Sequence, residues 1–142
     1  LDPTTLSTGA YLNVAAHSDV AVARRVVRGS IGTMAHFSSM KGASIEEVSK
    51  ASRETVEHVG KHYQLGLHGD VRAVHLEKVD AEFIDNFAVV GTPQQVLDRL
   101  GKILKTMPLQ RICIMHGSRG ADPAESREVS ACVAEEVITH LR

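Results

Sequence analysis

Several polar side chains able to bind a ligand follow an apolar run in the middle of the chain. Gly91 ends the run 87–90, and Thr92, Pro93 and Gln95 come directly after it. Thr92 is a good N-cap, Pro93 suits the first position of a helix, and Gln95 completes a capping box. The free N–H groups at such a helix start can receive a phosphate, a carboxylate or a carbonyl oxygen. Plain N-capping explains the same residues equally well, so both interpretations stay open.

A second polar group lies in a glycine-rich stretch after the apolar run 111–115. It contains His116, Ser118 and Arg119. These side chains, in a loop that leaves the end of a strand, suit an anionic or polar substrate. The alternative is a solvated loop of ordinary turn residues.

Two further polar residues lie in the segment 9–17, which reads as a strand. Asn13 is placed in its middle and His17 at its end. A buried asparagine needs a hydrogen-bond partner, which is either a neighbouring residue or a ligand. Asn13 is therefore a candidate binding residue.

A metal site and three common catalytic sites are not supported. His58 and His62 have the i, i+4 spacing of metal ligands, but Val59 stands where a zinc protease motif has glutamate, and no third ligand is evident. We expect a solvated helix face there. The sequence also lacks the glycine fingerprint of dinucleotide-binding folds, the P-loop and the serine-hydrolase elbow.

The elements that must position these residues follow from hydrophobic spacing and capping residues. Apolar runs predict strands over 9–17, 87–90 and 111–115, the last two buried on both faces. Hydrophobic spacing predicts helices over 20–37, 79–86 and 93–106. A further helix is expected to start at Ser44, with Glu47 as its capping-box partner, and a last one to run from Asp122 to the end, with Glu125 as the partner of Asp122. Segment 64–75 reads as irregular, and Gly29 and Gly32 either permit close packing or break the first helix. This order predicts an α/β fold with a parallel sheet and a single domain over 1–142.

Composition narrows the classes of partner. The chain has 142 residues, a formal net charge of −1 and no apolar run long enough to cross a membrane, which argues against nucleic-acid and membrane partners. Cys113 and Cys132, both in apolar runs, read as small core residues of a cytoplasmic protein. The chain begins with Leu1 and has no signal-peptide pattern, so we expect a processed or truncated piece of a longer protein.

Three parts of the chain carry a resemblance to a known family. Segment 87–100 (FAVVGTPQQVLDRL) resembles a late strand and helix of the luciferase-like monooxygenase superfamily, and 134–142 (AEEVITHLR) resembles its closing helix. Segments 23–30 (ARRVVRGS) and 37–40 (FSSM) are similar to the branch that uses coenzyme F420, to which methylenetetrahydromethanopterin reductase belongs. The resemblance covers about Gly9 to Arg142 and rests on the order and spacing of these segments.

The resemblance implies the last three βα units of a TIM (β/α)8 barrel. The parent enzyme would be an oxidoreductase that uses F420 or FMN, for hydride transfer or flavin-dependent oxygenation of a small-molecule substrate. Its coenzyme contacts come largely from earlier strands, so this chain alone would be inactive. By position, Asn13, Thr92, Arg99 and the loop from His116 to Arg119 would lie on the substrate side. A three-strand wedge leaves open sheet edges, which predicts a homo-oligomer that covers them. A small α/β module that binds an anion at Gly91–Gln95 is the alternative.

Overall fold

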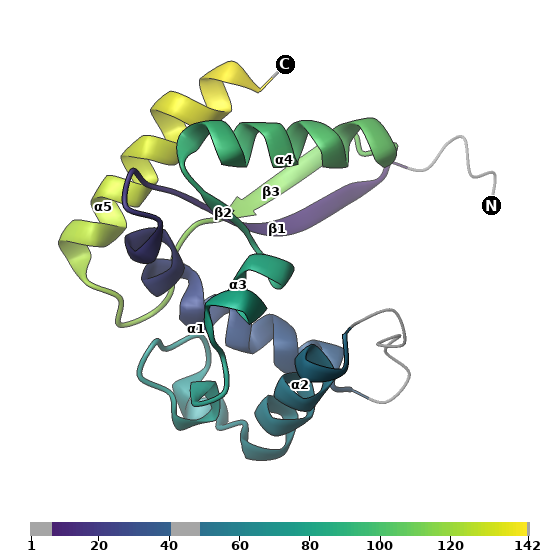
Figure 1. Ribbon diagram of the computed structural model, residues 1–142, viewed down its shortest axis with the longest axis vertical. Helices are drawn as coiled ribbons and strands as arrows, with labels where there is room; N and C mark the ends of the chain where they lie inside the picture. Colours follow the sequence, from purple (N-terminus) through teal and green to yellow (C-terminus); the bar gives the residue numbers. More distant parts are fainter. Residues whose placement is uncertain (1–6, 41–48, 142) are drawn as a thin grey trace.

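The computed structural model describes residues 7–40 and 49–141 and has an α/β architecture (Figure 1). Three strands, β1 (Gly9–Ala16), β2 (Val89–Gly91) and β3 (Arg111–Met115), form one parallel sheet in the order β2-β1-β3. Val14 of β1 pairs with Val89, and Asn13 pairs with Met115 on the other side. The first strand of the chain is therefore the central strand of the sheet.

This strand order is that of an open, doubly wound sheet. Three consecutive strands of a (β/α)8 barrel lie side by side in chain order, with the second strand in the centre. The parallel strands and amphipathic helices expected from the sequence are confirmed, but in a different neighbour order from that of a barrel wedge.

Helices cover both faces of the sheet. After β1 come α1 (Val20–Ser38), α2 (Lys50–His62) and α3 (Ala81–Phe87), and after β2 comes α4 (Pro93–Thr106). Figure 1 shows α4 along one face of the sheet, with α1 and α3 on the opposite side. After β3, α5 (Pro123–Cys132) continues through a π-helical turn, η4 (Val133–Val137), and a final 3-10 turn, η5 (Ile138–His140).

Capping side chains set the starts of these helices. Asp19, Ser49, Asp80, Thr92 and Asp122 each accept a hydrogen bond from a backbone N–H group of the first turn. The bounds of α1 and α4 agree closely with the predicted helices. The predicted N-cap and partner of the second helix, at positions 44 and 47, lie outside the described residues, and the described α2 has its N-cap at Ser49.

The core forms where α1 packs on β1 and on the segment between α2 and α3. Gly29 in α1 allows that segment a close approach, because an added Cβ would lie 2.3 Å from the carbonyl oxygen of Gly69. At Gly32 an added Cβ would lie 2.2 Å from Leu76 Cδ2. The helix runs unbroken through both positions, so its glycines serve close packing.

Three sequence expectations need correction. Phe87 is the last residue of α3, and β2 begins only at Val89, because Asp80 caps a helix that uses the first residues of the apolar run. β3 is not buried on both faces: Cys113 is an exposed free thiol, and Tyr11, its partner on the neighbouring strand, is 69 % exposed, so this face is uncovered here. Cys132 is half-buried, and burial raises the pKa of its thiol to about 11.

The fourth correction concerns the start of α5. Asp122 accepts hydrogen bonds from the N–H groups of Ala124 and Glu125, as expected of an N-cap. The Glu125 carboxylate, however, pairs with Arg25 at 2.6 Å. Because this ion pair holds the carboxylate, the reciprocal half of the predicted capping box is not formed there.

Candidate functional site

The three strands end at one edge of the sheet, and the candidate residues lie near it. Ala16 is level with Gly91, and the His17 N–H donates to the Gly91 carbonyl at 3.1 Å. Thr92 and His116 directly follow the ends of β2 and β3. In open α/β sheets this carboxyl edge is where ligands bind. The geometry therefore places the candidate site at the edge that the sequence indicated.

The turn at Gly91 is built for capping. The Thr92 N–H donates to Gln95 Oε1 at 2.9 Å, and the Gln95 N–H donates to Thr92 Oγ1 at 3.4 Å. A Cβ at Gly91 would lie 2.8 Å from Gln95 Oε1, so glycine makes room for the capping side chain. Pro93 has no N–H group, which leaves only that of Gln94 to a ligand in the first turn. Helix capping accounts for Gly91, Thr92 and Gln95.

Arg99 lies on α4, one turn beyond Gln95, and is half-buried. In the described part of the chain its guanidinium forms neither a salt bridge nor a side-chain hydrogen bond. Among the described residues, Arg99 therefore has no polar partner, and no hydrogen bond or salt bridge joins it to the loop after β3.

Asn13 is a buried acceptor without a donor. Its side chain is 3 % exposed, and within residues 7–40 and 49–141 its Oδ1 atom has no hydrogen-bond partner. By strand alternation Asn13 shares a face of the sheet with Tyr11 and Ala15. A buried carbonyl oxygen left unpaired costs about 1–3 kcal/mol, which a donor from a ligand or from another chain segment would offset.

His17 is held by its neighbours. Its Nδ1 accepts the N–H of Asp19 at 2.9 Å, and its Nε2 lies 3.3 Å from the Glu128 carboxylate of α5. The imidazole therefore links the start of α1 to α5.

The three candidate residues of the loop after β3, His116, Ser118 and Arg119, differ in their contacts. His116 is exposed. Ser118 Oγ accepts the N–H of Ser30 in α1 at 3.0 Å, which anchors the loop to that helix. Arg119 donates from Nε to Asp70 Oδ2 at 3.1 Å and from Nη2 to the Gly66 carbonyl at 2.8 Å. His116 is thus free to meet a ligand, while Ser118 and Arg119 take part in holding the loop.

Asp70 is the central residue of this contact, and the sequence analysis assigned it no role. Its carboxylate is fully buried and also accepts two hydrogen bonds from the Arg72 guanidinium, at 2.9 and 2.7 Å. The Arg72 side chain, its backbone N–H and Arg119 hold the pKa of Asp70 well below its usual range. Asp70 and Arg119 also form an isolated parallel β-bridge. No periodic pattern marks this segment, so the sequence offered no signal for the pairing.

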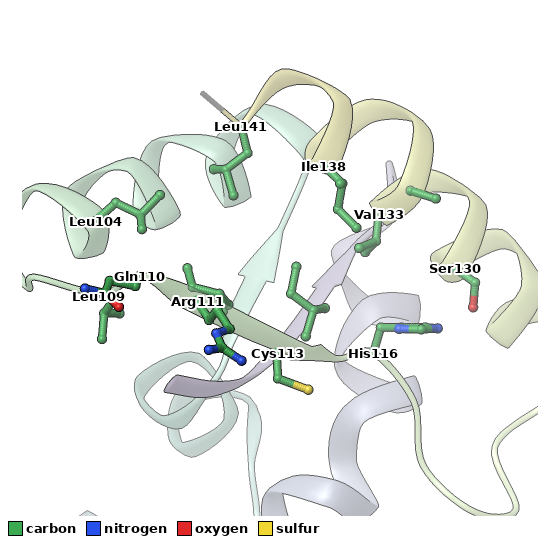
Figure 2. Close-up of a pocket in the computed structure, with 13 residues that line it drawn as sticks. Leu104, Leu109, Gln110, Arg111, Cys113, His116, Ser130, Val133, Ile138 and Leu141 are labelled. Atoms are coloured by element: carbon green, nitrogen blue, oxygen red, sulfur yellow. The ribbon is translucent and has the colours of Figure 1, made fainter. Parts of the chain in front are cut away.

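An apolar groove of about 600 Å³ runs along β3 (Figure 2). Its volume falls within the usual range for small-molecule sites. Figure 2 shows Val133, Ile138 and Leu141 of the C-terminal helix on one side of β3, with His116 near one end. In the described part of the chain no strand pairs with the outer edge of β3. The groove therefore borders an open sheet edge.

A cluster of aromatic and histidine side chains lies at the far end of α1. The rings of His36 and Tyr63 stack at 3.8 Å, and the Tyr63 hydroxyl lies 2.6 Å from His68 Nδ1. His75 is fully buried 4.5 Å from the Tyr63 ring. Burial, followed by the nearby His36, His58 and His68, lowers the pKa of His75. This cluster joins α1, α2 and the segment that carries Asp70.

Possible metal ligands do not gather within the described ranges: no three histidine, cysteine or acidic side chains there are arranged to hold an ion. His58 and His62 do lie side by side, with ring centroids 4.4 Å apart, but they remain a pair. Across the same ranges, no helix has the length and apolar character needed to cross a membrane.

Comparison with known proteins gives no match: no family model fits this chain, and no curated protein is similar to it.

Proposed function

We propose that this chain is the C-terminal part of a flavin- or F420-dependent oxidoreductase of the luciferase-like monooxygenase superfamily, and that it supplies the substrate side of the site. The observation that carries the proposal is that the three segments of resemblance pack around one sheet. α1 holds 23–30, β2 and α4 hold most of 87–100, and η4 and η5 hold most of 134–142. α4 contacts η4, and α1 contacts both α5 and β1.

The residues at hand supply binding and positioning. Asn13 offers a buried acceptor, and His116 an exposed imidazole beside an apolar groove. The bound coenzyme, F420 or FMN, would supply hydride transfer or oxygen chemistry in the full-length parent. The start of α4 does not complete a cradle for it, because the capping box uses the N–H groups of Thr92 and Gln95. No reaction step is therefore assigned to this chain, which we propose is inactive alone and works in the cytoplasm.

The barrel form of this proposal requires a different neighbour for β1. In a barrel, β2 would lie between β1 and β3. In this structure β1 lies between β2 and β3 and pairs with both. The other strands of the parent would have to displace one of these pairings. A structure of the parent with the order β2-β1-β3 retained would refute the barrel and leave an open α/β sheet.

Titration of the 142-residue chain with F420 and FMN, followed by flavin fluorescence, tests the proposal. We expect no submicromolar binding of either coenzyme to the chain and submicromolar binding to the longer parent. Submicromolar binding by the chain alone would contradict the claim that the coenzyme contacts lie elsewhere. The intact mass of the native gene product, about 35 kDa for a family barrel, is the accompanying measurement.

The second candidate function is a self-standing α/β module that binds a small anion, and the open-sheet strand order favours it. Binding at the start of α4 would rely on the Gln94 N–H group, since the capping box uses those of Thr92 and Gln95. A phosphate ester whose binding to the chain is lost in Thr92→Pro would support this function. The helix content of that variant, measured by circular dichroism, should equal that of the wild type.

We also propose that a second copy of the chain covers the edge of β3. The groove there is apolar, and Ile138, which lines it, is 51 % exposed. Unpaired strand edges with apolar surroundings favour association. Light scattering after gel filtration should give a dimer or larger, and Ile138→Glu should shift it toward monomer. A wild-type monomer that unfolds cooperatively would refute this proposal.

A further inference from the structure

Two arginines converge on one fully buried carboxylate where the segment between α2 and α3 meets the loop after β3. Arg72 donates from Nε to Asp70 Oδ1 at 2.9 Å and from Nη2 to Oδ2 at 2.7 Å. Arg119 donates from Nε to the same Oδ2 at 3.1 Å. The Asp70 side chain is 0 % exposed, while those of Arg72 and Arg119 are 73 % and 55 % exposed. The arginines therefore enclose the carboxylate and present their other side to solvent.

The charges in this group do not cancel. Asp70 neutralises one guanidinium, and in the described part of the chain no other carboxylate lies within salt-bridge distance of either arginine. The nearest acidic residues of the neighbouring loop and helix have other partners. Asp122 caps α5, and Glu125 pairs with Arg25. One positive charge is left over at this point of the surface.

The two guanidiniums are held in place before any ligand arrives. Arg119 also donates from Nη2 to the Gly66 carbonyl at 2.8 Å, and its backbone bonds to Gly69 and Val71 on the facing segment. Each guanidinium has five N–H donors, and these bonds use only its Nε and Nη2 groups. Binding an anion would therefore cost less side-chain entropy than at two free arginines.

The backbone around the pair is shaped for this close approach. Gly120 has φ +72°, and a Cβ there would lie 2.9 Å from Asp70 Oδ1 and 3.1 Å from Arg72 Nε. A separate cleft of about 390 Å³ is lined by Val71 and Ala121 together with Arg25, Arg28, Asp122 and Glu125, and neither Arg72 nor Arg119 lines it.

We propose that Arg72 and Arg119, positioned by Asp70, bind an oxyanion group of a small molecule, either a phosphate or a carboxylate. Arginine forks match the geometry of both groups and bind them through paired N–H donors. The site lies between the segment after α2 and the loop after β3, away from the start of α4. It does not depend on the oxidoreductase proposal, because binding here needs no coenzyme.

Titration of the 142-residue chain with inorganic phosphate, and separately with succinate, tests the site. Ionic strength is held constant with chloride, and the signals of the arginine Nε–H groups are followed by NMR. We expect saturable shifts at Arg72 and Arg119 and none at Arg127, an exposed arginine on α5. The stronger of the two probes identifies the oxyanion. Equal shifts at all arginines, or shifts that never saturate, would overturn the proposal.

Matched variants provide the second arm. Arg72→Gln should raise the dissociation constant about tenfold or more, and Arg72→Lys should also weaken binding because it keeps the charge but loses the fork. Arg127→Gln removes the same charge from an exposed helix face and should leave binding unchanged. Equal effects of Arg72→Gln and Arg127→Gln would mean that net charge alone attracts the anion, which would refute the site. The wild-type shifts keep the test valid if an Arg72 variant does not fold.

Discussion

Replacing Gly29 by alanine tests the closest backbone contact of the fold. In α1 an added Cβ would lie 2.3 Å from the Gly69 carbonyl oxygen, 2.8 Å from its carbon and 2.9 Å from the Asp70 carbon. All three atoms belong to the backbone. No side chain can rotate away to relieve the overlap, so the segment that carries Asp70 must shift by about 1 Å to reach ordinary contact distance.

Two opposing effects set the magnitude. Alanine is more favourable than glycine inside a helix by about 1 kcal/mol. Overpacking a tight contact costs about 1–3 kcal/mol, and a rigid backbone neighbour places Gly29 at the upper end. We expect a net loss of about 1–2 kcal/mol in the free energy of unfolding.

Gly101 in α4 provides the matched control. It also lies inside a helix, but nothing would lie within 4 Å of an added Cβ. Gly101→Ala should therefore stabilise the chain by about 1 kcal/mol. The two variants should differ by about 2–3 kcal/mol, or about 1 M in urea midpoint, followed by far-ultraviolet circular dichroism. If Gly29→Ala stabilises as much as Gly101→Ala, α1 does not pack against Gly69 as described.

Three further predictions concern the core, the cap and the histidine cluster. Burial lowers the pKa of His75 in the folded chain, whereas the unfolded chain takes up a proton below about pH 6.5. Stability should therefore fall as the pH drops through that value. The urea midpoint of the wild type should be lower at pH 5.5 than at pH 7.5, and this difference should be smaller in His75→Gln. If the variant shows the same difference as the wild type, other groups cause the effect. Thr92→Ala should cost about 1 kcal/mol in urea unfolding, and no loss would mean that the Gln95 side chain alone caps α4. Leu100→Ala, at a fully buried position, should cost about 2–5 kcal/mol, while Leu65→Ala, at a position 80 % exposed, should change stability little; equal losses would contradict the core assignment.

Local signals in the sequence predicted most element boundaries correctly. The capping box of Thr92 and Gln95 and the cap at Asp122 lie within a few residues of the groups that they bond, so the sequence order itself reveals them. The capping bonds also use the N–H groups of Thr92 and Gln95, so the first turn of α4 has only the Gln94 N–H left for a ligand, which the residue types alone could not decide.

Contacts between distant segments could not be predicted. Asp70 and Arg119 are 49 residues apart, and neither lies in a periodic pattern that would mark it as buried or paired. The exposed Cys113 shows the same limit, because an apolar run predicts a strand but does not show whether a helix covers each of its faces. The strand order depends on how the connections cross the sheet, which hydrophobic spacing does not encode.

The π-helical turn at Val133–Val137 affects which insertions and deletions the C-terminal helix can accept. Buried residues recur every fourth position at Val129, Val133 and Val137, whereas each four-residue step in an ideal α-helix advances about 40° around the axis. The wider turn offsets part of this drift and keeps Leu141 against the core. Because a π turn holds one residue more than an α turn, deleting one residue inside it can restore an α turn, whereas deleting one residue of α5 ahead of it would rotate every later residue by about 100° and carry Leu141 away from the core. The π turn is therefore the place in the C-terminal helix where a change of one residue in length disturbs the packing of Leu141 least.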